Sequence, residues 1–183
     1  MATFEHFYKS LSPNSQVRGK EFEKLVKWFL QTDPRWNNLV KKVWLWDEHP
    51  QREEWGPDCG IDLVFEDLIG NIWAVQAKCF DSHHSIRKEH MDSFIAESSD
   101  SRFQKRLLVT STNSIGPNVG RLLSRHNVVR VLLDDLVDAD LEYPENINDF
   151  KNAKRKDPLK PYPHQEDAIN DVIKGLRKAD KGQ

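Results

Sequence analysis

Apolar residues recur at helical spacing near the start of the chain. In the segment RGKEFEKLVKWFLQ, residues 18–31, they fall three and four positions apart, at Phe22, Leu25, Val26, Phe29 and Leu30. This spacing predicts an amphipathic helix with one face in a core. The Asp33-Pro34 pair predicts that the helix ends there or turns soon after.

Two short runs in the middle of the chain have a different pattern. Residues 60–65, GIDLVF, and 73–78, WAVQAK, are apolar and rich in β-branched or aromatic side chains, which favours strands. Between them, residues 68–71, LIGN, supply turn residues. The pattern predicts a β-hairpin centred near Ile69.

The second half alternates between the two kinds of element. A helix is predicted over residues 85–98, with Ile86, Met91, Phe94 and Ile95 inward, and Pro117 predicts the first turn of another. Strands are predicted over 106–112 and 128–136, with the Pro117 helix between them over 116–126. Earlier in the chain, residues 38–49 predict either a strand or a short helix that leads to a strand, and residues 49–57 predict a loop. Together they indicate an α/β fold with a mixed central β-sheet flanked by helices.

Composition narrows the class of protein. At 183 residues the chain is long enough for one domain with a substantial core. It has no apolar run of membrane-spanning length and no signal-peptide pattern at its start, so we expect no membrane partner. The two cysteines do not form a disulfide framework, which predicts a cytoplasmic protein.

Charge is unevenly distributed along the chain. The net charge of −2 argues against a protein that coats nucleic acid through bulk electrostatics. Lys and Arg nevertheless outnumber Asp and Glu between residues 87 and 130, whereas residues 131–150 contain acids and no base. The basic stretch either lines a phosphate backbone or forms an ordinary solvated surface.

The predicted hairpin brings chemistry onto one face. Because side chains alternate along a strand, Gln76 and Lys78 share a face, and a hairpin centred near Ile69 places Asp62 opposite Gln76. A slip of one residue in the register would separate these groups. A carboxylate that binds a divalent cation, next to a lysine that stabilises charge on phosphorus, suits metal-dependent attack on a phosphate.

These residues carry a family resemblance. The segment PDCGIDLVFEDLIGNIWAVQAKCF resembles the core of the PD-(D/E)xK nucleases, in the Mrr-like branch where Gln-x-Lys replaces Glu-x-Lys. GKEFEKLVKWFLQ resembles the first helix of that fold, KRLLVTST its next core strand and NVVRVLLDDLV its last strand. The resemblance covers roughly residues 15 to 140 and implies a restriction-endonuclease-like core.

The resemblance also implies residue roles. A Mg2+-dependent endodeoxyribonuclease of this kind would bind its metal through Asp62, Gln76, the backbone carbonyl of Ala77 and, through water, Glu23, while Lys78 assists catalysis on double-stranded DNA. Glu21 fits a solvent-facing position better than Glu23, and Asp58 in Pro57-Asp58 fits a turn residue better than a catalytic acid. A catalytically inactive nucleic-acid-binding or docking module, and an RNA- or structure-specific nuclease, remain alternatives.

A second metal site is a further alternative. Cys59, Cys79, His83 and His84 could form a cluster, although metal-ligand spacings are usually tighter than theirs. In the predicted register the two thiols lie on the face away from Asp62, which favours core positions for both.

The last part of the chain differs in character. We expect a nuclease domain over residues 1–150, a polar basic linker over 151–160, and over 161–183 a segment that resembles the Q-motif at the start of superfamily 2 helicases. By that resemblance Gln165 would recognise the adenine of ATP, with Tyr162 or Pro163 stacking beside it. A capping helix that follows a proline-rich turn is the alternative.

A nuclease of this branch followed by a helicase resembles the Type ISP restriction-modification enzymes. The resemblance implies a longer protein with its own helicase or translocase domain in cis, ATP and S-adenosylmethionine as cofactors, and DNA methyltransferase activity. It also implies a second converging enzyme molecule on the DNA.

Overall fold

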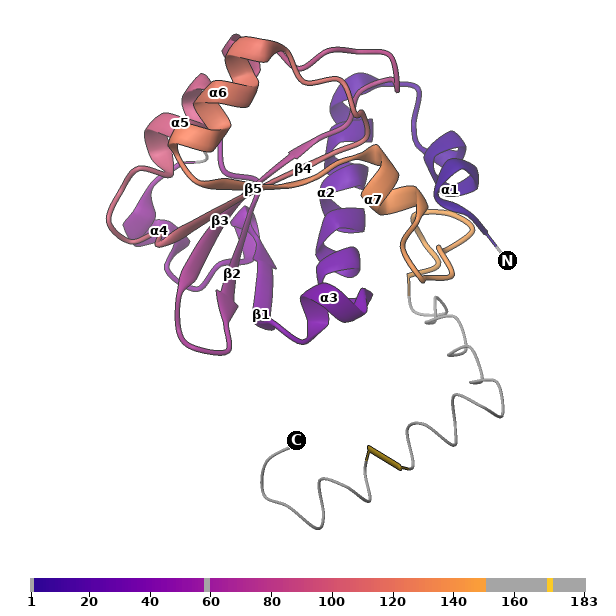
Figure 1. The fold of residues 1–183 in the computed structure, drawn as a ribbon, viewed down its shortest axis with the longest axis horizontal. Helices are drawn as coiled ribbons and strands as arrows, with labels where there is room; N and C mark the ends of the chain where they lie inside the picture. Colours follow the sequence, from indigo (N-terminus) through magenta and orange to yellow (C-terminus); the bar gives the residue numbers. More distant parts are fainter. Residues whose placement is uncertain (1, 58–59, 151–170, 173–183) are drawn as a thin grey trace.

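The computed structural model describes residues 2–57, 60–150 and 171–172 (Figure 1). Asp58 and Cys59 therefore lie outside the described residues. So do the linker predicted over 151–160 and, apart from residues 171–172, the predicted helicase segment with Tyr162, Pro163 and Gln165.

A mixed sheet of five strands forms the centre of the molecule (Figure 1). The strands lie side by side in chain order: β1 Val40–Leu45, β2 Leu63–Asp67, β3 Ile72–Lys78, β4 Lys105–Thr110 and β5 Val128–Val131. The pairs β1–β2 and β2–β3 are antiparallel, whereas β3–β4 and β4–β5 are parallel. The predicted α/β class with a mixed sheet is confirmed.

The hairpin of β2 and β3 has the predicted register. Leu63 pairs with Val75 and Phe65 with Trp73, which centres the hairpin on Ile69. The turn is held by the buried Asp67, whose carboxylate accepts hydrogen bonds from the backbone amide of Asn71 at 2.8 Å, that of Ile69 at 3.1 Å and the indole of Trp73 at 3.0 Å. The side-chain amide of Asn71 donates a fourth bond, at 2.9 Å. A buried carboxylate with four donors fixes the turn, and the turn fixes the register.

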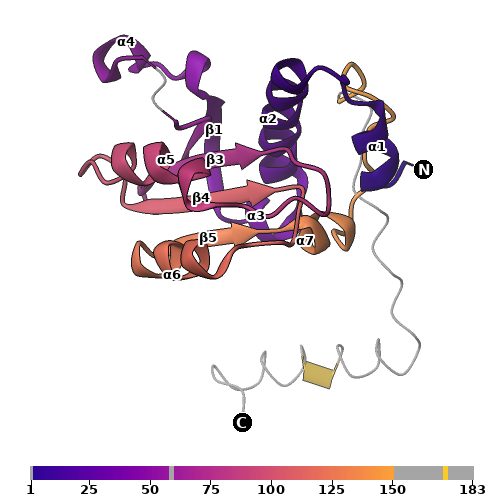
Figure 2. The same cartoon turned by 90° about the horizontal axis from the view of Figure 1, so that it is seen from above.

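Helices cover both faces of the sheet, as Figures 1 and 2 show. On one face lie α1 Phe4–Ser10, α2 Ser15–Thr32, α3 Pro34–Asn37 and α7 Leu133–Val137, which share a core with Leu63, Phe65 and Val75. On the other lie α5 Asp92–Glu97 and α6 Pro117–Arg125, packed on Val64, Ala74 and Leu108. The predicted inward positions of α2 are all buried. No described helix has the length and hydropathy needed to span a membrane.

Two predicted elements are shorter than expected. The helix over residues 85–98 reduces to a 3-10 turn, Lys88–His90, and α5, because Ile86 instead forms a parallel bridge with Ile115. Ile86, Met91, Phe94 and Ile95 are nevertheless all buried, as predicted. The strand over 128–136 ends at Val131, because α7 begins at Leu133. In its first turn the Asp135 side chain accepts the backbone N–H of Leu132 at 2.8 Å and so caps the helix.

Four of the described α-helices were not predicted: α1, α3, α4 (Arg52–Trp55) and α7, the last of which takes up the end of the strand predicted over 128–136. The N-terminal α1 begins after Thr3, whose hydroxyl accepts the backbone N–H of His6 at 3.2 Å, and it buries Phe4 and Phe7. The short α4 lies within the loop predicted over 49–57. The 3-10 turn before it, Trp46–Glu48, lies at the end of the segment predicted over 38–49. A threonine cap followed by two phenylalanines three residues apart was the signal for α1.

Candidate active site

Asp62 and Gln76 meet where β2 begins beside β3. The Asp62 backbone N–H donates to the Val75 carbonyl at 3.0 Å, which continues the hairpin pairing by one residue. Its Oδ2 accepts hydrogen bonds from the Gln76 side-chain amide and, at 2.7 Å, from the backbone N–H of Ala77. Gln76 is only 2% exposed, whereas Asp62 is partly exposed. The site therefore opens toward solvent at the carboxylate.

Lys78 lies two residues further along β3. By alternation it shares the face of Gln76, on the side of the sheet covered by α5 and α6. Its side chain is partly exposed, so the ammonium can reach a substrate while its stem packs on the sheet. The structure brings Asp62, Gln76 and Lys78 to one end of the hairpin, in the arrangement that the sequence predicts.

An aromatic cluster next to Lys78 was not predicted. The rings of Phe80 and His84 stack at 4.2 Å, and His90 lies 5.1 Å from Phe80 and 5.4 Å from His84. Burial and then the neighbouring His84 lower the pKa of His90, and the positive charge of Lys78 lowers it further. His90 is therefore neutral at physiological pH and adds no positive charge beside Lys78.

Glu23 is the predicted site residue that the hairpin does not position. It is 8% exposed on α2, which packs on the face of the sheet opposite the Gln76 side chain, and it forms an ion pair with Lys20 at 3.0 Å. A buried carboxylate on the helix beside β3 differs from the charged helix surface that would be expected of a residue without a role. Glu21 is half-buried rather than solvent-facing, and it accepts the backbone N–H of Ser12 at 2.7 Å.

The alternative cysteine and histidine cluster gains no support. Among the described residues, no group of three or more His, Cys, Asp or Glu is arranged to hold a metal ion. Cys79 packs against the α2 core as expected, and burial raises the pKa of its thiol to about 11, so the thiol stays protonated. His84 stacks on Phe80 instead.

Thr110 lies directly beside Lys78 on the neighbouring strand. The two residues are register partners in the β3–β4 pair, so their side chains share a face. Thr110 is fully buried, and its hydroxyl has no hydrogen-bond partner among the described residues. A buried hydroxyl without a partner costs about 1–3 kcal/mol of stability.

Thr110→Val is therefore expected to raise the free energy of unfolding by about 1 kcal/mol, because valine has the same shape and no polar group to bury. Urea denaturation measures the change. Thr112→Val is the matched control, since the Thr112 hydroxyl bonds the carbonyls of Ser82 at 2.9 Å and His84 at 2.8 Å and its loss should lower stability. Equal destabilisation by the two substitutions would contradict the prediction.

Comparison with known proteins agrees with this geometry. Residues 31–153 match the family model Mrr_cat_2, a restriction endonuclease. The chain belongs to this restriction endonuclease family. The matched range contains Asp62, Gln76 and Lys78 but begins after Glu23.

A solved structure is similar to this chain over most of the chain's length. The fold matches the ATP-dependent Type ISP restriction-modification enzyme LlaBIII bound to DNA, with a TM-score of 0.68 and 26% sequence identity over 88% of this chain. The match covers only 10% of the LlaBIII chain. Comparison with curated protein sequences found no match. The predicted resemblance to Mrr-like nucleases and Type ISP enzymes is confirmed.

Proposed function

We propose that this restriction endonuclease domain hydrolyses phosphodiester bonds of double-stranded DNA with Mg2+, through Asp62, Gln76, Lys78 and Glu23. The observation that carries the proposal is the hairpin register. It joins the Asp62 carboxylate to the Gln76 amide and the Ala77 backbone, and it places Lys78 on the same face. Acidic residues near a strand are common and would support a nuclease only weakly. A carboxylate, an amide and an ammonium group that one hairpin register brings to the same face are stronger support.

The donor set suits a hard cation. A carboxylate oxygen of Asp62, the amide oxygen of Gln76 and the backbone carbonyl of Ala77 are the kinds of ligand that Mg2+ takes in proteins. The Gln76 amide would turn its oxygen, rather than its N–H, toward the shared position. Bound Mg2+ would supply Lewis-acid polarisation of the phosphoryl group. Since the set holds one charged ligand, we expect weak affinity until substrate phosphate adds its oxygens.

The protein side chains have separate tasks. Lys78 would donate hydrogen bonds to a phosphate oxygen and stabilise the negative charge that develops there. Asp62 would keep the hydrogen bond from the backbone N–H of Ala77, which holds the carboxylate in place when the Gln76 amide turns. Glu23 would accept a hydrogen bond from the attacking water and orient it, with Lys20 holding the carboxylate in place.

The longer protein is part of the proposal. LlaBIII is ATP-dependent, and this chain corresponds to a small part of it. We propose that residues 1–150 form the nuclease, that 151–160 link it to a helicase beginning at 161–183, and that Gln165 binds adenine there. ATP, S-adenosylmethionine, methyltransferase activity and a second converging molecule would belong to that longer enzyme. Because residues 1–150 hold 18 Lys and Arg against 24 Asp and Glu, a net charge of −6, the nuclease should bind DNA weakly by itself and depend on the motor to reach it.

Removal of the metal ion tests the proposed chemistry. The 183-residue chain, in excess over a supercoiled plasmid, is expected to nick it slowly with Mg2+ and not at all with EDTA. Gel electrophoresis separates nicked from supercoiled plasmid. Equal nicking with and without EDTA would refute the metal requirement. Plasmid binding without any nicking would favour the inactive docking module.

Gln76→Glu is expected to strengthen metal binding. A second carboxylate would lie within hydrogen-bond range of Asp62, and like charges at that separation repel unless a cation lies between them. The variant should therefore be less stable than the parent without metal, and Mg2+ should raise its melting temperature more than it raises that of the parent. Thermal melts over a range of Mg2+ concentrations measure both effects.

Gln16→Glu is the matched control for that experiment. It adds the same charge at an exposed position on α2, so its melting temperature should respond to Mg2+ as the parent does. If Gln76→Glu responded no more strongly than Gln16→Glu, the Gln76 side chain would not be a metal ligand.

A further inference from the structure

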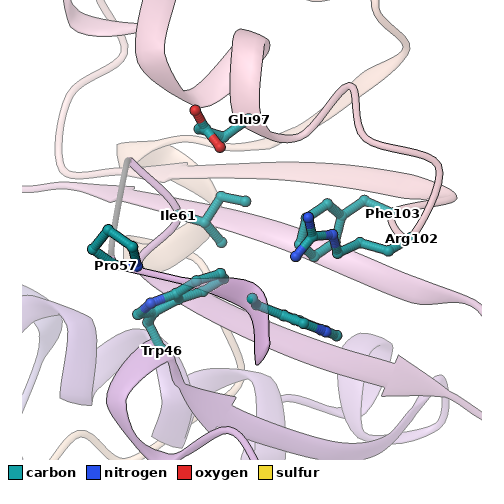
Figure 3. Close-up of a pocket in the computed structure, with 7 residues that line it drawn as sticks. Trp46, Pro57, Ile61, Glu97, Arg102 and Phe103 are labelled. Atoms are coloured by element: carbon teal, nitrogen blue, oxygen red, sulfur yellow. The ribbon is translucent and has the colours of Figure 1, made fainter. Parts of the chain in front are cut away.

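A pocket lies between α5 and the segment that connects β1 to β2. It is lined by Trp46, Trp55, Pro57, Ile61, Glu97, Arg102 and Phe103, and its cavity volume is about 60 Å³. Figure 3 shows Trp46, Ile61, Phe103 and Arg102 arranged around one space, with Glu97 above it. This volume is below the range for pockets that enclose a whole small molecule, so the pocket can take only the edge of a planar group, with the rest of that group in the open mouth.

The pocket walls are flat aromatic rings held in place by their neighbours. Trp55 lies 5.9 Å from Trp46 and meets Phe103 edge to face at 5.5 Å. On its other side Trp55 stacks on the buried ring of His49 at 4.1 Å. These contacts fix the Trp55 ring, which is itself only partly buried. The Arg102 guanidinium also lies over this ring, at 5.2 Å, so the aromatic cluster supports a guanidinium plane on which another planar group can stack.

Two polar groups add recognition chemistry. The indole N–H of Trp46 is buried and has no hydrogen-bond partner among the described residues, although Trp46 lines the pocket. In Figure 3 its nitrogen lies on the side of the ring near Pro57, which is another lining residue. Glu97 is exposed at the rim and accepts hydrogen bonds only. A buried donor and a rim acceptor beside stacking rings match the polar edge of a nucleobase.

Arg102 argues against a positively charged ligand. Its guanidinium already covers the rings of Trp55 at 5.2 Å and Phe103 at 5.7 Å, and Asp100 holds it there through an ion pair at 2.9 Å. A lysine or arginine side chain from a peptide would meet a like charge on the same aromatic faces. A base would instead extend the stack, since guanidinium planes and aromatic rings both stack on bases.

The pocket adjoins the proposed cleavage site through two of its lining residues, Ile61 and Trp46. Ile61 lines the pocket and precedes Asp62, and the Trp46 backbone N–H donates to the Asp62 carbonyl at 2.9 Å. We propose that this pocket receives a single unstacked nucleobase from the DNA strand whose phosphate is held at Asp62. The proposal rests on the proposed function, because it takes DNA as the substrate.

The charge around the pocket restricts how DNA can approach. Glu53 and Glu54 on α4 are exposed next to Trp55, so this surface repels a phosphate backbone running across it. A base turned out of the helix can enter while its backbone stays on the side of Lys78. The pocket therefore selects DNA that is already locally unpaired, because turning out a paired base costs a few kcal/mol.

The test compares two duplexes that differ by one base. Fluorescence anisotropy in EDTA, which prevents cleavage, measures the binding of the 183-residue chain to a duplex with a single-nucleotide bulge and to the same duplex with an abasic bulge. We expect about tenfold tighter binding when the base is present, the effect of one stacking contact. Trp55→Ala should remove the difference, and Trp55→Phe should retain part of it.

Control variants separate stacking from folding and from general hydrophobicity. Arg102→Gln, at a partly exposed position, should reduce the difference even if Trp55→Ala folds poorly, while Ile69→Ala at the exposed hairpin tip should preserve it in full. Equal binding of the two duplexes by the parent chain, or an unchanged difference in Trp55→Ala and Arg102→Gln, would overturn the proposal. Displacement of the bulged duplex by free deoxyadenosine monophosphate at equal concentration would also overturn it, in favour of a free-nucleotide site.

Nicking with Mg2+ is measured separately on the same proteins. If the parent chain nicks DNA but shows no base-dependent affinity, the proposal for the pocket is wrong and the proposed nuclease function stands. If it shows base-dependent affinity but does not nick DNA, the pocket binds a base and the proposed hydrolysis is wrong.

Discussion

Asp62→Ala and Lys78→Ala are each expected to reduce plasmid nicking by at least about a hundredfold, the usual effect of removing one group that stabilises developing charge. Asp62 is the one carboxylate that the hairpin places at the site, and Lys78 is the cation beside it. Both side chains are partly exposed, so truncation leaves no core cavity. Lys78→Ala should change the melting temperature little, whereas Asp62→Ala removes the acceptor of the buried Gln76 amide and should lower the melting temperature. A nicking time course and a thermal melt on each variant measure the two effects.

Lys42→Ala is the matched control for the lysine. Lys42 is an exposed lysine on β1, another strand of the same sheet, so its loss changes the net charge equally. It should nick DNA at the parental rate. Parental nicking by Asp62→Ala or Lys78→Ala would remove the assignment of the active site, and equal loss in Lys42→Ala would show that net charge, rather than position, controls the reaction.

The hairpin was predictable because its signals were local and agreed with each other. Strand propensity, the turn residues around Ile69 and the alternation of side chains all favoured one register, and the buried Asp67 holds that register in the structure. Asp62, Gln76 and Lys78 were therefore placed together from sequence alone. Their chemical roles remain predictions, as does that of Glu23, since no bound metal or substrate tests them.

Elements that depend on distant contacts were harder to predict. The apolar spacing after Ile86 favoured one long helix, but Ile86 donates its backbone N–H to Ser114 and accepts that of Gly116, and this pairing with a loop competes with the helix. The aromatic pocket is of the same kind. Phe103 is far in sequence from Trp46 and Trp55, and the tryptophan-rich segment near Trp46 indicated only a strand or a short helix leading to a strand.

Gly60 carries the largest structural constraint near the site. Its φ is +119°, a conformation that side chains other than glycine rarely adopt. A β-carbon built on Gly60 would lie 2.9 Å from the Ser93 Cβ and 3.2 Å from the Phe94 backbone nitrogen, at the start of α5. Because backbone atoms form part of this contact, rotation of a side chain cannot relieve it. The close approach of Gly60 to α5 is therefore part of what positions Asp62, two residues later.

Gly60→Ala is expected to lower the free energy of unfolding by about 2 kcal/mol or more, through backbone strain and overpacking together. It should also reduce nicking more than the loss of stability explains, because either α5 or the start of β2 must move away. Urea denaturation gives the stability, and nicking is measured at a temperature where the variant is fully folded.

Gly70→Ala separates the two contributions. Gly70 also has a positive φ, +88°, but a β-carbon there meets nothing within 4 Å at the tip of the hairpin. Its substitution should cost only the backbone strain, about 1 kcal/mol, and should leave nicking unchanged. The excess loss in Gly60→Ala then measures the contact with α5. Equal effects of the two substitutions on stability and on nicking would show that the approach of Gly60 to Ser93 does not position Asp62.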